Sequence, residues 1–142
     1  MIQRIQSVWL LLSSASFLLL SRLPIATGVK TDGSEVKLMA DERLHIMLFA
    51  IVLLVLPLIT IFLFKNRVGQ KKLIWVHSLL AILMVTFFWL AKDAFTAVEP
   101  PFASSAYGLG VIVPIIGLVF NVLAFRGIRA DEKLIKAADK FR

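Results

Sequence analysis

Long apolar segments separated by short polar stretches dominate the pattern along the chain. Four such segments occupy residues 5–26, 44–64, 73–90 and 107–125. A helix rises about 1.5 Å per residue, so each segment is about long enough to cross a hydrocarbon core of ~30 Å. The pattern therefore predicts four membrane-spanning helices within a single transmembrane domain that covers residues 1–142.

The first segment has a second interpretation. A basic start such as Arg4 followed by an apolar run is also typical of a signal peptide. Residues 21–28 lack a clean cleavage site with small residues at both required positions. We therefore interpret the segment as a retained span.

The loops on the outer side are short and polar. Asp32-Gly33 is a turn signal that predicts a small hairpin between Val29 and Val36. Residues 91–106 contain Pro and Ser pairs and are interpreted as loop. The expected fold class is all-α, an integral membrane four-helix bundle with a short amphipathic helix at its cytoplasmic C-terminus.

That C-terminal helix is predicted over residues 126–142. Ile128, Leu134 and Ile135 recur at helical spacing among charged residues. The helix is expected to contact either anionic lipid in the headgroup layer or a protein partner, and both alternatives stay open. Its basic residues are Arg126, Arg129, Lys133, Lys136, Lys140 and Arg142.

Composition indicates that the chain is a membrane protein, and the distribution of charge predicts its orientation in the membrane. The hydrophobic share of 59% leaves too little polar surface for a soluble protein. The net charge of +7 comes from residues that flank apolar segments, which disfavours a nucleic-acid partner and fits the positive-inside rule. Eleven of the 16 Lys and Arg residues fall on the side of both termini, which we expect to be cytoplasmic: Arg4, Lys65, Arg67, Lys71, Lys72 and the six of the tail.

Polar side chains inside the spans are few, and each is a candidate for function because its burial in hydrocarbon is costly. His77 and Asn121 lie at matched depth from the cytoplasmic ends of their spans. A hydrogen bond between them is expected. We favour a structural role for this pair over a role in proton or substrate movement.

Two prolines fall within spans. Pro57 and Pro114 each remove a backbone hydrogen bond, to the carbonyls of Leu53 and Gly110, and are expected to kink their helices near mid-membrane. One proline in each two-span half is also weakly similar to the paired broken helices of transporters.

Catalytic chemistry has few candidates here. The chain has no cysteine, and its second histidine, His45, is expected about 20 Å from His77 along the membrane normal. No catalytic residue, metal ligand or cofactor is therefore predicted, and we expect a protein that is not an enzyme.

The ends of the chain carry a resemblance. Residues 1–6 and 64–67, Tyr107 with Gly108 and Pro114, and the tail segments 128–134 and 139–142 together resemble a bacterial family known only as domain of unknown function 4293. The resemblance covers essentially the full length. It implies a small four-span protein of the bacterial inner membrane, with no activity or functional residue to carry over.

Small residues at 13–16 and at Gly108, Gly110 and Gly117 indicate close helix contacts, within this chain or with another. We therefore expect a non-enzymatic accessory or scaffold subunit of a larger inner-membrane complex, with other membrane-protein subunits as partners. The alternative is a small transporter or channel component.

Overall fold

The computed structural model describes residues 3–97 and 102–140. In chain order its elements are α1 (Gln3–Leu18), the short 3-10 helix η1 (Leu19–Ser21), β1 (Ala26–Lys30), β2 (Glu35–Leu38), α2 (Leu44–Phe62), α3 (Arg67–Thr96), β3 (Phe102–Tyr107), the 3-10 helix η2 (Leu109–Val111) and α4 (Ile112–Lys140).

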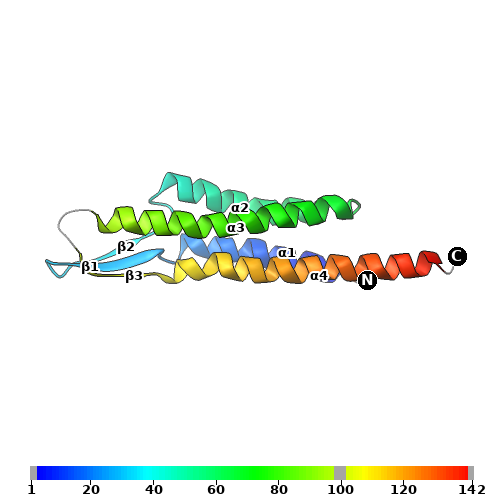
Figure 1. The fold of residues 1–142 in the computed structure, drawn as a ribbon. Helices are drawn as coiled ribbons and strands as arrows, with labels where there is room; N and C mark the ends of the chain where they lie inside the picture. The colour runs from blue at the N-terminus through cyan, green and yellow to red at the C-terminus, as the bar shows by residue number, and fades with distance from the viewer. Residues whose placement is uncertain (1–2, 98–101, 141–142) are drawn as a thin grey trace.

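The four α-helices pack lengthwise into an elongated body (Figure 1). Its helices contact one another in a closed ring, because α1 contacts α2 and α4, and α3 contacts α2 and α4. The start of α1, the turn at residues 63–66 and the far end of α4 lie at one end, called here the terminal end. The strands gather at the opposite end, the sheet end.

The bounds of the first and third helices differ from the expected spans. Helical structure at the N-terminus stops at Ser21 instead of residue 26, because Pro24 disfavours helical backbone in the residue before it. α3 is longer than the expected 73–90. Its start is set by Asn66, whose Oδ1 accepts a 2.9 Å hydrogen bond from the amide of Gly69 and so caps the helix.

The expectation of a mainly helical fold with four helices is confirmed for residues 3–97 and 102–140, but the fold is not all-α, because three strands also form an antiparallel sheet in the order β2-β1-β3. The hairpin predicted around Asp32-Gly33 is present as β1 and β2, and Gly33 takes the positive φ of 84° that its turn requires. Residues 91–106 are expected to be loop, whereas Phe102–Tyr107 form β3. Its strand is built by pairing with β1, in which Ala26 lies opposite Tyr107, so its partner is some 80 residues away in the chain.

The predicted tail helix is also wrong in one respect. α4 runs without interruption from Ile112 to Lys140, so the amphipathic segment continues the fourth apolar helix instead of forming a separate one. α4 extends past the start of α1 and past the α2–α3 turn (Figure 1).

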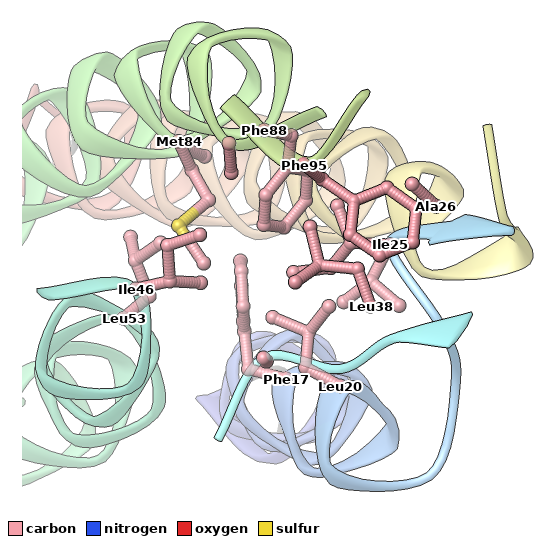
Figure 2. Close-up of a cluster of buried hydrophobic side chains, with 14 residues drawn as sticks. Phe17, Leu20, Ile25, Ala26, Leu38, Ile46, Leu53, Met84, Phe88 and Phe95 are labelled. Carbon is pink, nitrogen blue, oxygen red and sulfur yellow. The ribbon is translucent and has the colours of Figure 1, made fainter. Parts of the chain in front are cut away.

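The main core lies toward the sheet end and joins all four helices, with Val113 as the member from α4, to the sheet (Figure 2). Phe17 and Leu20 from the α1 region, Leu53 from α2, and Met84 and Phe88 from α3 are all nearly inaccessible to solvent. Ile25, Ala26 and Leu38 bring the β1–β2 region into the same cluster. This packing fixes the sheet against the ends of the helices.

Within the part of the chain that the structure describes, three helices are long and apolar enough to cross a membrane: Leu44–Phe62, Arg67–Thr96 and Leu109–Ala138. A shorter apolar helical stretch covers Ile5–Ser21. Many large apolar side chains on these helices face outward, including Phe62 at 80% and Leu79 at 65% exposed.

Candidate functional site

The polar centre of the molecule begins with a backbone carbonyl that a proline leaves without a partner. Pro57 has no N–H, so the carbonyl of Leu53 one turn earlier in α2 lacks its usual intrahelical donor. Nε2 of His77 on α3 lies 2.9 Å from that oxygen. The side chain of His77 thus supplies the missing hydrogen bond.

The second ring nitrogen of His77 is also used. Nδ1 lies 2.6 Å from Nδ2 of Asn121 on α4. An amide nitrogen can only donate, so Nδ1 accepts and the proton of the neutral ring stays on Nε2, where it is donated to Leu53. The structure therefore brings together the two polar residues that the sequence singles out, with one tautomer serving both contacts.

Asn121 extends the network to α1 and back to α3. The hydroxyl of Ser13 donates to Oδ1 of Asn121 at 3.2 Å, and Nδ2 of Asn121 also donates to the hydroxyl of Ser78 at 3.1 Å. The series Ser13, Asn121, His77 and the Leu53 carbonyl runs through all four helices. We call these four groups the polar chain.

The polar chain is sealed from solvent. His77 and Asn121 are each 1% exposed and Ser13 is fully buried. The ring of Phe17 meets His77 edge-on, with centroids 5.5 Å apart. These side-chain hydrogen bonds of Ser13, His77 and Asn121 each join two helices, and a buried network with satisfied partners fixes the relative positions of the helices.

A second polar cluster lies at the terminal end. Nε2 of Gln6 on α1 donates to Oδ2 of Asp131 on α4. Nε2 of Gln70 on α3 donates to the Thr60 carbonyl of α2 at 3.0 Å. Nζ of Lys71 contacts both carboxylate oxygens of Glu132, at 2.7 and 2.9 Å, and lowers the pKa of Glu132.

A profile of the family described as Domain of unknown function (DUF4293) matches residues 2–141. The chain belongs to this family. The resemblance noted from the ends of the DUF4293 chain is thus confirmed over nearly its whole length. A search of curated proteins found no match to the DUF4293 protein.

The two prolines of the DUF4293 protein occupy unlike positions. Pro57 lies well inside α2. Pro114 is the third residue of α4, in the first turn, where backbone amides have no intrahelical partner in any case. The sequence predicts a kink at Pro114 near mid-membrane, whereas the structure has Pro114 at the start of α4, because the apolar run before it folds as η2 and the end of β3.

The basic residues of the tail stay apart from the polar chain. Arg126, Arg129, Lys133 and Lys136 line a surface hollow of about 500 Å³ on α4 together with Glu132. The guanidinium of Arg129 lies 5.0 Å from the ring centre of Phe125. Arg142 and the side chain of Lys140 lie outside the described residues.

Within residues 3–97 and 102–140, no group of three or more His, Cys, Asp or Glu side chains is arranged to hold a metal ion. His45 is exposed and meets the ring of Phe87 edge-on, far along α2 from Leu53.

Sequence reasoning missed two members of the polar chain. The Leu53 carbonyl was recognised as freed by Pro57, but it was not matched to a donor. A freed carbonyl in an apolar helix requires a donor from a neighbour, and His77 is the buried donor on the next helix. For Ser13, the sequence predicts only a small residue at a close helix contact.

Proposed function

We propose that this DUF4293 protein is an integral membrane protein with four crossings that serves as a non-enzymatic accessory or scaffold subunit of a larger membrane complex. The observation that carries the membrane part is the distribution of side chains on the helices. Large apolar residues face outward from all four, while Ser13, His77 and Asn121 face inward. A water-soluble protein does not expose so continuous an apolar surface.

The length of the first helix fits this proposal. α1 and η1 together cover Gln3–Ser21. With about 1.5 Å per α-helical residue and about 2 Å per 3-10 residue they reach about 30 Å, the thickness of a hydrocarbon core. Four crossings would then place the terminal end on one side of the membrane and the sheet on the other.

The charge distribution supports an orientation. Arg4, Lys65, Arg67, Lys71, Lys72 and the tail cations belong to the terminal end, and Lys and Arg are enriched on the cytoplasmic side of membrane proteins. We therefore propose that both termini lie in the cytoplasm, that the membrane is the bacterial inner membrane, and that the tail cations contact anionic lipid there.

The accessory role is supported by how the polar groups are used. The donors and acceptors of the polar chain are engaged in joining helices, which is a structural task. Surfaces suited to partners lie instead at the two ends. Five of the six residues of β3 are exposed on an edge strand, and α4 continues beyond the rest of the helical body with an exposed, charged surface. Partner subunits are expected to engage these parts.

A transporter or channel component is the alternative. Its support is the polar chain, which would give an ion or proton a place to reside inside the membrane. Toward the sheet end, however, the space between the helices is filled by Phe17, Met84 and Phe88, each no more than 2% exposed. This apolar packing favours the accessory role.

Single-cysteine labelling tests the topology, because the natural chain contains no cysteine. Thr31→Cys places a thiol in the exposed β1–β2 turn, and Ala137→Cys places one on the exposed end of α4. A membrane-impermeant maleimide should label the first in intact spheroplasts and the second only after lysis. Equal labelling of both in intact cells would contradict the four crossings.

Co-purification tests the role. A tagged protein extracted in a mild detergent should bring down a second membrane protein in fixed proportion. A homogeneous species that contains this chain alone, at the expression level of the native gene, would exclude the accessory role.

A further inference from the structure

A cavity of about 340 Å³ opens at the terminal end, between the ends of all four helices. Its polar lining includes Gln6 of α1, Arg67 of α3 and Asp131 of α4. Its apolar lining includes Ile61 and Phe62 of α2 and Phe64 of the turn. The cavity therefore combines one acidic side chain, one basic side chain and an apolar wall.

Asp131 is the unusual member of this lining. Its side chain is only 6% exposed, and Oδ2 accepts the hydrogen bond from Gln6. Oδ1 is buried and has no hydrogen-bond partner among the residues that the structure describes. Among the side chains that the structure describes, at residues 5–97 and 102–138, no Lys, Arg or His forms an ion pair with this carboxylate. A buried carboxylate oxygen without a donor is costly, so the site favours a ligand that brings one.

The missing group can be described by its chemistry. An ionised carboxylate accepts hydrogen bonds and attracts positive charge, so the complementary group is an ammonium that still carries N–H bonds. Arg67 on the same cavity supplies planar donors of the kind that suit a phosphate. A ligand with an ammonium and a phosphate a few bonds apart would satisfy both residues at once.

We propose that this cavity binds a phosphoethanolamine group, with the ammonium donating to Oδ1 of Asp131 and the phosphate held by Arg67, and that the group is the headgroup of a membrane phospholipid. The choice of a lipid source rests on the proposed membrane location. Phe62 on the cavity is the most exposed large apolar side chain of α2, and Ile59 on the preceding turn is 45% exposed. Acyl chains of a bound lipid would follow this outward face of α2.

Access to Oδ1 involves Gln6. The oxygen is shielded from solvent, and the amide that holds Oδ2 belongs to the same cavity wall. The ammonium therefore reaches Oδ1 once the Gln6 side chain shifts, and Gln6 can then donate to the carboxylate from its new position. Gln6 is a positioning residue in this account, whereas Asp131 and Arg67 contact the ligand.

Thermal unfolding of the purified protein in detergent tests the proposal, with short-chain phosphatidylethanolamine, phosphatidylcholine or phosphatidylglycerol added at equal concentration. Phosphatidylcholine carries the same charges but has no N–H donor, and phosphatidylglycerol has no cation. Phosphatidylethanolamine should raise the melting temperature above the other two. Asp131→Asn should weaken its apparent affinity about tenfold, the scale expected for one charge-assisted hydrogen bond, and Arg67→Gln should weaken it as well.

Asp93→Asn is the matched control, since it makes the same change at an exposed acid near the opposite end of α3. It should keep the preference for phosphatidylethanolamine. Equal stabilisation of the natural protein by phosphatidylethanolamine and phosphatidylcholine would overturn the site, as would an Asp131→Asn variant that retains the preference. If Asp131→Asn does not fold, the comparison of the two lipids on the natural protein and on Arg67→Gln still decides.

Two further experiments distinguish an error in the lipid assignment from an error in the proposed membrane location. Free phosphoethanolamine that stabilises the protein as well as the lipid does would show that the ligand is soluble and that the lipid assignment is wrong. Release of the protein from membranes by alkaline carbonate would refute the proposed membrane location. The detergent assay would still report on the Asp131 site in that case, so the two failures are distinguishable.

Discussion

Nδ1 of His77 lies 2.6 Å from Nδ2 of Asn121, while the opposite ring nitrogen lies 2.9 Å from the Leu53 carbonyl that Pro57 leaves without a donor. One imidazole therefore joins α4 to α2 from its place on α3. Because its two nitrogens have different partners, replacing the ring affects both helices.

His77→Leu is expected to destabilise the protein by about 1 to 2 kcal/mol, because it leaves the Leu53 carbonyl and the Asn121 amide without this partner in an apolar interior. Reversible unfolding in mixed detergent micelles measures the change. His45→Leu is the matched control, since His45 is exposed and lies outside the polar chain. Equal losses for the two variants would contradict the structural role of His77.

The contribution of Pro57 can be separated by a double-mutant cycle. Pro57→Ala restores an N–H that can donate to the Leu53 carbonyl within α2. His77→Leu should then cost less in the Pro57→Ala background than in the natural one, with a coupling of about 0.5 to 1 kcal/mol. Strict additivity would show that the two residues do not act on the same carbonyl.

Gly117→Ala is expected to destabilise the protein by about 1 to 3 kcal/mol through overpacking. A Cβ at this position would lie 2.8 Å from the ring of Phe17, which is itself 2% exposed. In a freely exposed helix the same change would stabilise by up to about 1 kcal/mol, so the sign of the effect is informative. Thermal unfolding of Gly117→Ala, alone and combined with Phe17→Leu, measures it, and the second change should restore part of the loss.

A stable Gly117→Ala variant would mean that α1 and α4 are not in close contact at this level.

The sequence leaves open whether its small residues mark helix contacts within this chain or with another chain. The small residues of α1 and α4 pack within this chain, since Ser13 donates to the Gly117 carbonyl at 3.3 Å and Ser14 donates to the Leu54 carbonyl at 2.6 Å.

The apolar pattern predicts the four helices because each depends mainly on its own local composition. It does not predict β3, whose central residues 103–106 are all Ala or Ser and become a strand only by pairing with β1. It also predicts α3 too short. The apolar segment stops at Lys71 and Lys72 on one side and before Asp93 on the other, but the helix continues through these charged residues. The length of an apolar segment indicates how much of a helix can lie in hydrocarbon, whereas capping of the backbone determines where the helix begins and ends.

The polar chain was partly accessible to sequence reasoning. His77 and Asn121 stand out because polar residues are rare in the apolar segments. The expected span starts at residue 73, whereas α3 starts at Arg67, so His77 lies farther from the helix end than the apolar pattern predicts and contacts Leu53 in the middle of α2. The contact between Gln6 and Asp131 spans 125 positions in the chain, and no local signal connects them.

Glu132→Gln is expected to lower stability at neutral pH and to have less effect in acid. The contact with Lys71 lowers the pKa of Glu132 below its ordinary value of 4.5. The folded state therefore holds this proton less tightly than the unfolded state, so the contribution is complete above 4.5 and is lost as pH falls through the lowered pKa. Melting temperatures of the natural and variant proteins, measured from pH 7 downward, should converge.

Glu42→Gln serves as the charge-matched control for that series, because Glu42 is an exposed acid at the sheet end. Its difference from the natural protein should not show the same convergence. A Glu132→Gln variant as stable as the natural protein at pH 7 would mean that the Lys71 contact adds nothing in solution, which is the common result for exposed ion pairs.

The tail of α4 divides into two parts with different expected roles. Asp131 and Glu132 contact α1 and α3, whereas Lys133 and Lys136 face outward beyond those contacts. Deleting residues 133–142 should therefore leave the melting temperature nearly unchanged but reduce the anionic lipid that co-purifies, with a dependence on salt. Deleting residues 129–142 should lower the melting temperature as well, because it also removes both contacts to the helical body. Native mass spectrometry counts the retained lipid. Unchanged retention after the shorter deletion would assign the exposed cations to a protein partner instead of to lipid.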